Sequence, residues 1–395
     1  MKRNFMLILA VLLMNGRIAL HYEGSYDSML KTGAERTGSY LPLLRGKSIA
    51  LVVNHTSLIG DVHLLDSLIA LKINIVKIFS PEHGFRGDAD AGSYISGGYD
   101  QRTGVEVVSL YGKKKKPTLE DLKDVELVVF DIQDVGVRFY TYLSTMTLVM
   151  EACAENFIPF IVFDRPNPNG FYTDGPVLEP GYSSFVGMHP VPVVHGMTAG
   201  EYAKMVNEEG WLTNNVKCEL LVIPVLNYTH HALYDLPVKP SPNLADMTSV
   251  YLYPSLCYFE GTIMSVGRGT EMAFRLIGHP DYKTGDITFT PVSKPGASVN
   301  PPFKDQQCFG FDYSNLADSI LLNKQIYLQP LIQAWKYFNG KKEFFNNYFN
   351  NLAGNSTLRK QIEAGLTEEE IKSSWQTELE NFRKIRKKYL LYDAE

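Results

Sequence analysis

The sequence predicts an α/β fold whose larger part is a doubly wound, mostly parallel sheet of the Rossmann-like type. Short apolar runs alternate with helical patterns from about residue 48 to residue 224. The run at residues 126–132 is apolar along most of its length, which is typical of a strand buried on both faces. Strands separated by helices need right-handed crossovers, and these place the strands parallel to one another.

The individual elements follow from the same pattern. We predict strands at residues 48–54, 74–80, 105–110, 126–132, 160–164 and 219–224. Helices are predicted at residues 63–71, 142–156 and 198–209, the last of which opens with a capping box formed by Thr198 and Glu201. No Gly-x-Gly-x-x-Gly follows the first strand, so the sequence does not indicate a dinucleotide cofactor.

A proline-rich stretch at residues 237–242 ends this alternation. Beyond it we predict strands near residues 260–265 and 272–277, a mixed segment at 303–313, and helices near 327–338 and 367–389. Thr367 and Glu370 form a second capping box. The expected organisation is a signal peptide at 1–21, a Rossmann-like domain with the active site at 24–240, and a smaller, auxiliary α+β domain at 241–395.

Composition and charge narrow the class of protein. The 395 residues carry a net charge of −5 and are 45% hydrophobic, which is ordinary for a globular protein and unlike a nucleic-acid-binding one. The basic run at 113–116 is predicted to be a solvated turn. Lys2 and Arg3 precede an apolar run at 5–14, the pattern of a secretory signal peptide, so we expect export to the periplasm or the medium. No later apolar stretch indicates a membrane span.

Polar side chains follow four of the predicted strands at the point where each strand ends. Ligands bind at the carboxyl ends of the strands in open parallel sheets, so these residues predict a polar active site there. The four segments are Asn54 to Ser57, Ser80 to Gly87, Asp131 to Tyr142, and Asp164 to Gly170.

Metal-dependent and serine-based chemistry are not indicated. His55, His83 and His195 could join Asp131 and Asp164 as metal ligands, but no His-x-x-x-His or similar spacing supports this. The four cysteines form no Cys-x-x-Cys pair, which argues against a zinc site. Neither Ser57 nor Ser80 lies in a Gly-x-Ser-x-Gly context. We therefore expect neither a metal nor a cofactor.

Several long motifs resemble those of the NamZ-like exo-β-N-acetylmuramidase family. They are VNHTS (53–57), FSPEHGFRG (79–87), FDIQDVGVRFYTY (130–142), DRPNPNG (164–170), VHGMT (194–198), EGT (260–262), SVGRGT (265–270) and the tail at 384–392. Ala273 stands where the resemblance leads us to expect proline. The resemblance implies removal of N-acetylmuramic acid from the non-reducing ends of peptidoglycan fragments, in a cleft between a Rossmann-like domain and an auxiliary C-terminal domain.

Glycoside hydrolysis usually needs two carboxyl groups, one of which protonates the leaving oxygen. The resemblance points to Glu82 as this general acid, and the apolar neighbours Phe79 and Phe85 would shield it from water. The second group stays open. Candidates are Asp131, Glu260, Asp134, Asp164 and the N-acetyl group of the substrate itself.

Muramic acid differs from glucosamine by a lactyl carboxylate, which an arginine binds well. Arg86, Arg138, Arg165 and Arg268 are the candidates. Tyr140 and Tyr142 are expected to pack on the sugar ring. Further predicted contacts to muramyl saccharides are Asn54, His55, His83, Gln133, Asp134, Asp164, Asn167 and His195.

Two other functions compete with the glycosidase. One is a metal-dependent cell-wall amidase on the same fold, which a chelator would inactivate. The other is a non-catalytic periplasmic protein that binds muramyl sugars, in which replacing Glu82 would leave binding unchanged.

Overall fold

The computed structural model describes residues 30–85, 98–340 and 342–394. The predicted signal peptide and Arg86 lie outside these ranges. No helix within the described ranges is both long and apolar enough to cross a membrane.

The larger sheet confirms the predicted fold class and all six predicted strands. Within the described residues it has seven strands in the order β5-β6-β4-β1-β7-β8-β9, and all neighbours are parallel except β5 and β6. The sequence analysis did not predict β5 or the small β2–β3 hairpin, whose strands have two residues each. The strands are β1 (Ser48–Val53), β2 (Leu58–Ile59), β3 (Val62–His63), β4 (Asn74–Ser80), β5 (Gly98–Tyr99), β6 (Glu106–Ser109), β7 (Leu127–Asp131), β8 (Phe160–Phe163) and β9 (Leu220–Ile223).

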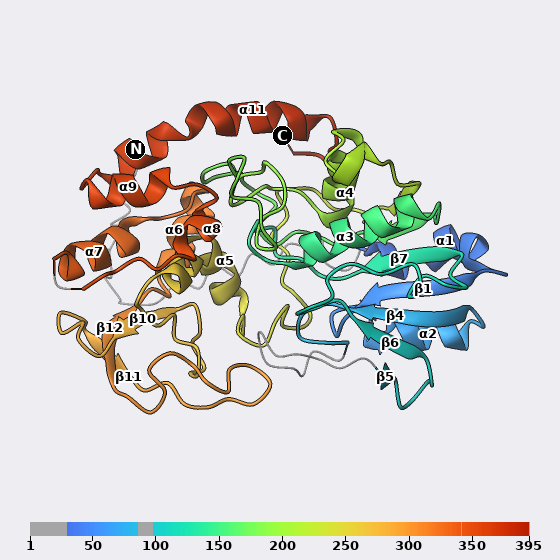
Figure 1. Ribbon diagram of the computed structural model, residues 1–395, viewed down its shortest axis with the longest axis horizontal. Helices are drawn as coiled ribbons and strands as arrows, with labels where there is room; N and C mark the ends of the chain where they lie inside the picture. Colours follow the sequence, from blue (N-terminus) through green and yellow to red (C-terminus); the bar gives the residue numbers. More distant parts are fainter. Residues whose placement is uncertain (1–29, 86–97, 341, 395) are drawn as a thin grey trace, which may run out of the picture.

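Helices cover both faces of this sheet, as a doubly wound fold requires (Figure 1). Along β1, Ile49, Leu51 and Val53 pack with α1 and α2, whereas Ala50 and Val52 belong to the core that α3 and α4 cover. Successive side chains of a strand point to opposite faces of the sheet, so this one apolar strand contributes side chains to both cores. The helices are η1 (Gly33–Glu35), α1 (Thr37–Leu44), α2 (Leu64–Ala70), α3 (Tyr142–Glu155), α4 (Ala199–Glu208) and η2 (Thr213–Asn215).

The C-terminal half combines helices with a three-stranded antiparallel sheet of order β10-β12-β11. Figure 1 shows it on the opposite side of the molecule from the large sheet. Its elements are α5 (Met247–Leu256), η3 (Cys257–Gly261), β10 (Leu276–His279), β11 (Ile287–Phe289), β12 (Cys308–Asp312), α6 (Leu316–Asn323), α7 (Gln329–Phe338), α8 (Phe349–Ala353), α9 (Thr357–Glu363), α10 (Glu368–Ser374) and α11 (Gln376–Lys387).

Three predictions in this half were wrong in detail. The strand expected at 272–277 is β10, which begins only at Leu276 because residues 271–275 form turns. The strand expected at 260–265 begins instead as the 3₁₀ helix η3, because Gly261 packs so closely on Phe349 that a Cβ atom would lie 2.5 Å from the Phe349 backbone. The single helix expected at 367–389 is two helices, α10 and α11, divided at Trp375. The Trp375 indole donates to Asp174 at 3.3 Å, which fixes the chain at this break. Both predicted capping boxes are present.

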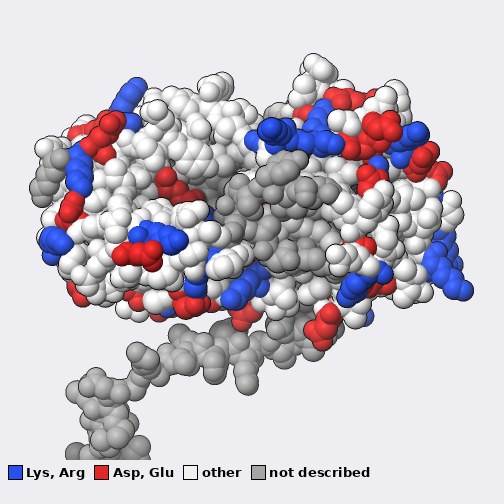
Figure 2. All heavy atoms as spheres, turned by 60° about the horizontal axis from the view of Figure 1, so that its bottom comes forward, with Lys and Arg blue, Asp and Glu red and all other residues white. Residues whose placement is uncertain are grey.

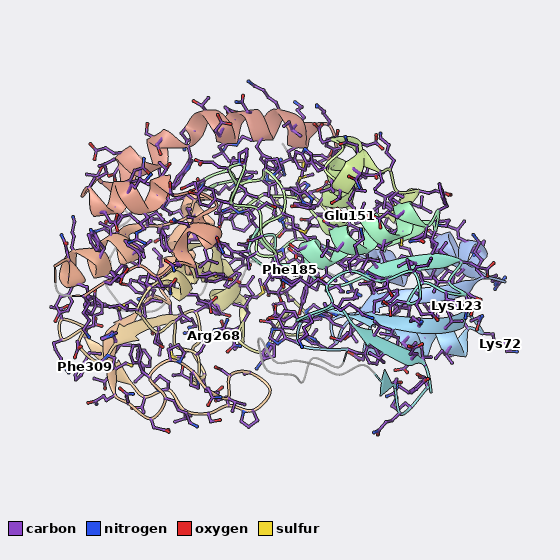
Figure 3. The ribbon with its side chains drawn as sticks, in the orientation of Figure 1. Lys72, Lys123, Glu151, Phe185, Arg268 and Phe309 are labelled. Carbon is purple, nitrogen blue, oxygen red and sulfur yellow. The ribbon has the colours of Figure 1, made fainter. Side chains whose placement is uncertain are left out.

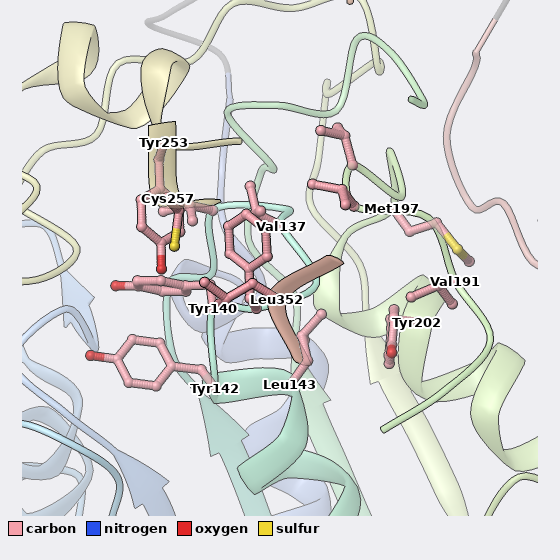
Figure 4. Close-up of a cluster of buried hydrophobic side chains, with 14 of the residues drawn as sticks. Val137, Tyr140, Tyr142, Leu143, Val191, Met197, Tyr202, Tyr253, Cys257 and Leu352 are labelled. Atoms are coloured by element: carbon pink, nitrogen blue, oxygen red, sulfur yellow. The ribbon is translucent and has the colours of Figure 1, made fainter. Parts of the chain in front are cut away.

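One apolar core joins the two halves. It runs from the α3 face of the large sheet through α5 and η3 to α7 and α9. Figure 4 shows part of it, with Val137 and Leu143 from the first half beside Tyr253, Cys257 and Leu352 from the second. The four cysteines are buried and free. Because the core is continuous, the relative position of the two halves is set by packing.

The end of the chain returns to the first half. Helix α11 crosses the top of the molecule, from α9 towards α4 (Figure 1). The Tyr392 hydroxyl then donates to Asp164 at 2.6 Å, and the Leu391 amide donates to Glu201 at 2.8 Å. This tail is a second connection between the halves.

Candidate active site

A cavity of about 780 Å³ lies where the two halves meet, at the carboxyl ends of the large sheet's strands. Both halves line it, so it lies where the family resemblance led us to expect a cleft. The first half contributes Glu82, His83, Tyr111, Lys115, Tyr140, Thr141, Tyr142 and Phe185, and the second contributes Ser241, Asn243, Tyr253, Glu260, Arg268, Phe274, Asn300, Tyr348 and Asn351, among others.

Glu82 reaches the cavity from the loop that follows β4. Pro81 ends the strand, and His83 and Gly84 then take positive φ angles of 68° and 78°, which turn the chain sharply at this edge. Glu82 is partly exposed and remains beside the cavity rather than beneath it.

Two hydroxyl groups hold the Glu82 carboxyl. Thr141 donates to it at 3.0 Å and, although it precedes α3, its side chain does not cap that helix. Burial, the charge of Glu82 and a hydrogen bond to Glu82 raise the pKa of Tyr111. A hydroxyl can donate to a carboxylate or accept from a carboxylic acid. Glu82 is therefore provided with partners in both protonation states.

Glu260 lines the cavity from the opposite half and has a cationic partner. Nε and Nη2 of Arg268 lie 2.8 and 2.7 Å from the same oxygen of Glu260. The guanidinium also lies over the ring of Phe274, 5.1 Å from its centroid. Burial alone would lower the pKa of Arg268, but the charge of Glu260, the hydrogen bond to Glu260 and neighbouring groups together outweigh it, and the pKa is raised. The pair keeps opposite charges fixed at this wall.

Tyr140 and Tyr142 line the cavity and also contact Pro240, in the segment that joins the two halves. Their hydroxyls donate to the carbonyl of Pro240 at 2.7 and 3.4 Å. Figure 4 shows the two rings extending in the same direction, and their centroids are 4.8 Å apart. Ser241 and Asn243, which follow Pro240, also line the cavity. The tyrosines thus place this segment against the site.

Asp131 and Arg165 lie away from the cavity and bind each other. Nε and Nη2 of Arg165 contact the two oxygens of Asp131 at 2.6 and 2.9 Å, and the carboxylate has no exposed surface. Nη2 of Arg165 also donates to the Leu58 carbonyl at 2.9 Å. These contacts hold β7 to the loop after β8.

Arg138 is buried and joins the two halves. Its guanidinium donates to the carbonyls of Pro176 and Val191 in the first half, and of Leu352 and Ala353 in the second, at 2.7–2.9 Å. Burial lowers its pKa to about 10. Arg138 does not line the cavity.

The remaining predicted residues divide between the cavity and the layer beneath it. His83, Tyr140, Tyr142 and Arg268 line the cavity together with Glu82 and Glu260. His55 lines a second cavity of about 540 Å³ on the other side of Pro240. Asn54, Gln133, Asp134, Asp164, Asn167 and His195 are buried and line neither cavity, and Arg86 lies outside the described residues.

The cavity also contains side chains that the sequence analysis did not single out. Tyr111 follows β6, so the rule that ligands bind at strand ends could have found it. Lys115 belongs to the basic run that was predicted to be a solvated turn, yet it lines the cavity. Phe185 and Arg268 both lie near the middle of the molecule, where the halves meet (Figure 3). Sequence spacing alone gives no signal for Phe185.

Within residues 30–85, 98–340 and 342–394, no three His, Cys, Asp or Glu side chains are grouped so that they could hold a metal ion.

Comparison with known proteins agrees with this arrangement. Two family models match nearly the whole described chain, the exo-β-N-acetylmuramidase NamZ N-terminal model at residues 49–248 and the C-terminal model at 251–392. The chain is 42% identical over 374 residues to the peptidoglycan β-N-acetylmuramidase NamZ of Bacillus subtilis (strain 168), with 89% of each chain covered.

Two solved structures have the same fold. Both are DUF1343 family proteins from Bacteroides fragilis NCTC 9343. One is 46% identical with a TM-score of 0.86, covering 93% of this chain and 99% of that one. The other is 28% identical with a TM-score of 0.76, covering 92% and 99%. With both family models matched, the chain belongs to the NamZ family of exo-β-N-acetylmuramidases, which are glycoside hydrolases.

Proposed function

We propose that this enzyme releases N-acetylmuramic acid from the non-reducing ends of peptidoglycan fragments and that Glu82 is its general acid. The exo mode and the substrate class rest on the family and on the named activity of the Bacillus relative. A cavity of about 780 Å³ is in the size range of small-ligand sites. We also propose that the enzyme is exported, on the pattern of residues 1–21.

The observation that carries the role of Glu82 is the contrast between the two glutamates of the cavity. Arg268 forms an ion pair with Glu260. Glu82 contacts hydroxyl groups and has no cationic partner among the described residues. Two carboxyl groups with different surroundings can take the two roles of a glycosidase. Glu82 protonates the glycosidic oxygen as its bond to the sugar breaks.

Glu260 is the second carboxylate of this proposal. Burial first, and then the charges of neighbours that include both Glu260 and Glu82, raise the pKa of Tyr348, so both glutamates act on the same region of the cavity. As an anion, Glu260 would stabilise the positive charge that develops on the sugar ring. Asp131 is buried against Arg165 and does not line the cavity.

The test is hydrolysis of a chromogenic β-N-acetylmuramide and of its β-N-acetylglucosaminide analogue by the mature protein, with and without EDTA. We expect release from the muramide that EDTA does not change. Glu82→Gln should lower kcat by about 10²- to 10⁴-fold, the usual contribution of a general acid.

Glu120→Gln is the matched control, because the Glu120 side chain is 86% exposed and does not line the cavity. It should have full activity. Loss of chromophore release in EDTA would show that a metal takes part and would contradict this mechanism. EDTA-sensitive cleavage of the amide bond of muramyl peptides, without chromophore release, would favour the amidase. Absence of turnover with retained binding of muramyl sugars, equal in wild type and Glu82→Gln, would favour the binding protein.

A further inference from the structure

Lys115 differs from its neighbours in the basic run. Lys114 pairs with Asp121 at 2.9 Å, and Lys116 pairs with Glu151 and Glu155 at 3.2 and 2.7 Å. Lys115 lines the cavity, and no carboxylate within the described ranges pairs with it. Its ammonium nitrogen instead lies 4.3 Å from the centroid of the Phe185 ring.

The loop that carries Phe185 supplies a second polar group. Ser184 and Gly187 exchange backbone hydrogen bonds of 2.9 and 3.0 Å, which close a tight turn around Phe185. Ser184 lines the cavity, and its hydroxyl oxygen has almost no exposed surface and no hydrogen-bond partner among the described residues. A buried hydroxyl without a partner is unfavourable, so this position favours a ligand that accepts a hydrogen bond.

Lys115 and Arg268 are the two Lys or Arg side chains that line the cavity among the described residues, and only Lys115 has no carboxylate paired with it. Arg268 is already neutralised by Glu260. On the face shown in Figure 2, acidic and basic side chains are interspersed among the described residues rather than gathered into a single-sign patch. Discrimination by charge would therefore come from side chains inside the cavity, where contacts are partly shielded from water.

We propose that Lys115, positioned by Phe185, binds the lactyl carboxylate of the muramic acid ring and that Ser184 donates a hydrogen bond to the same group. This inference rests on the proposed function and assigns its sugar specificity. A glucosamine ring has a hydroxyl where muramic acid has the lactyl ether, so it would leave the ammonium and the Ser184 hydroxyl without an anionic partner. Lys115 rather than an arginine is then the residue that selects muramic acid.

The experiment compares two chromogenic β-N-acetylmuramides, one with a free lactyl carboxylate and one with its methyl ester. Lys115→Gln should lower kcat/KM for the free acid about ten- to hundred-fold, mainly through KM, because a charge-assisted hydrogen bond is lost. Its kcat/KM for the ester should remain that of the wild type. Lys115→Arg, which retains the charge, should restore most of the preference.

Lys113→Gln is the matched control, since it removes the same charge two residues away at a position that does not line the cavity. It should leave both kcat/KM values unchanged. Phe185→Leu keeps apolar bulk but removes the ring beneath the ammonium, and should reduce the preference for the free acid several-fold, as expected for a cation–π contact.

Two outcomes separate this inference from the proposed function. Suppose that wild type hydrolyses the muramide and that Lys115→Gln keeps the full preference for the free acid over the ester. Lys115 then does not bind the lactyl carboxylate, and the proposed function stands. If wild type hydrolyses neither substrate, the proposed function fails. Calorimetric titration with N-acetylmuramic acid then still tests Lys115, because binding that is equal in wild type and Lys115→Gln, or absent from both, overturns the inference.

Discussion

Glu82 and Asp131 lie at the carboxyl ends of two strands that both pair with β1, yet their surroundings are opposite. Glu82 lies in the loop beyond β4, is partly exposed and has hydroxyl partners. Asp131 is the last residue of β7, has no exposed surface and is bound on both oxygens by Arg165. An acid at the end of a strand, such as Asp131, is buried and holds neighbouring segments together. An acid in the loop beyond a strand, such as Glu82, reaches the cavity.

This comparison predicts that replacing Asp131 lowers stability, whereas replacing Glu82 lowers activity. Asp131→Ala should show the largest effect on stability. The substitution leaves Arg165 buried without its partner, so the free energy of unfolding should fall by about 3–5 kcal/mol. Urea unfolding measures it. Glu82→Gln should change the unfolding free energy by less than about 0.5 kcal/mol, as surface substitutions usually do. Similar losses in the two variants would remove the distinction between the two acids.

Asp134 extends the comparison. It is a buried acid that also follows β7, but unlike Asp131 it has no cationic partner among the described residues. One oxygen accepts from the Gly136 amide at 2.7 Å, and the other has no hydrogen-bond partner among the described residues. Burial raises the pKa of Asp134 to about 7. The folded protein thus binds this proton more tightly than the unfolded chain, so Asp134 favours folding below about pH 4 and loses that contribution as the pH rises to about 7.

Asp134→Asn should therefore stabilise the protein at pH 8, by roughly 2–4 kcal/mol relative to its effect at pH 4.5. The amide keeps an acceptor for Gly136 and carries no charge. Urea unfolding of wild type and variant at the two pH values gives the difference. A difference that does not change with pH would show that Asp134 titrates normally in the folded protein.

The sequence predicted the large sheet better than the site because the two depend on different interactions. Central strands such as β1 and β7 are continuous apolar runs, so local pattern was enough. A strand was expected at 260–265, but its first two residues belong to the 3₁₀ helix Cys257–Gly261, and the close approach of Gly261 to Phe349 is a long-range contact that local pattern does not show. Such tertiary packing overrides local propensity.

The cavity shows the same division. Glu82, Glu260 and Arg268 were predicted, with the family resemblance helping to select them. Lys115 and Phe185 were not, because they come from loops far apart in sequence whose approach is fixed by the packing around them. Several strand-end residues that sequence reasoning placed at the substrate, such as Arg138 and Asp164, instead make hydrogen bonds to carbonyls, hydroxyls and amides of the protein itself, although Nε of Arg138 has no such partner among the described residues.

The smallest predicted effect concerns how Glu82 is held. Thr141→Val removes the hydroxyl that donates to Glu82 but keeps the shape, and no helix cap is lost because the Thr141 side chain makes none. We expect kcat/KM for the muramide to fall about three- to tenfold, the value of one hydrogen bond. Thr147→Val is the control, because the Thr147 hydroxyl donates to the Leu143 carbonyl of its own helix at 2.9 Å. Equal kinetics in the two valine variants would mean that Glu82 does not depend on Thr141, and Tyr111 would then be its main positioning residue.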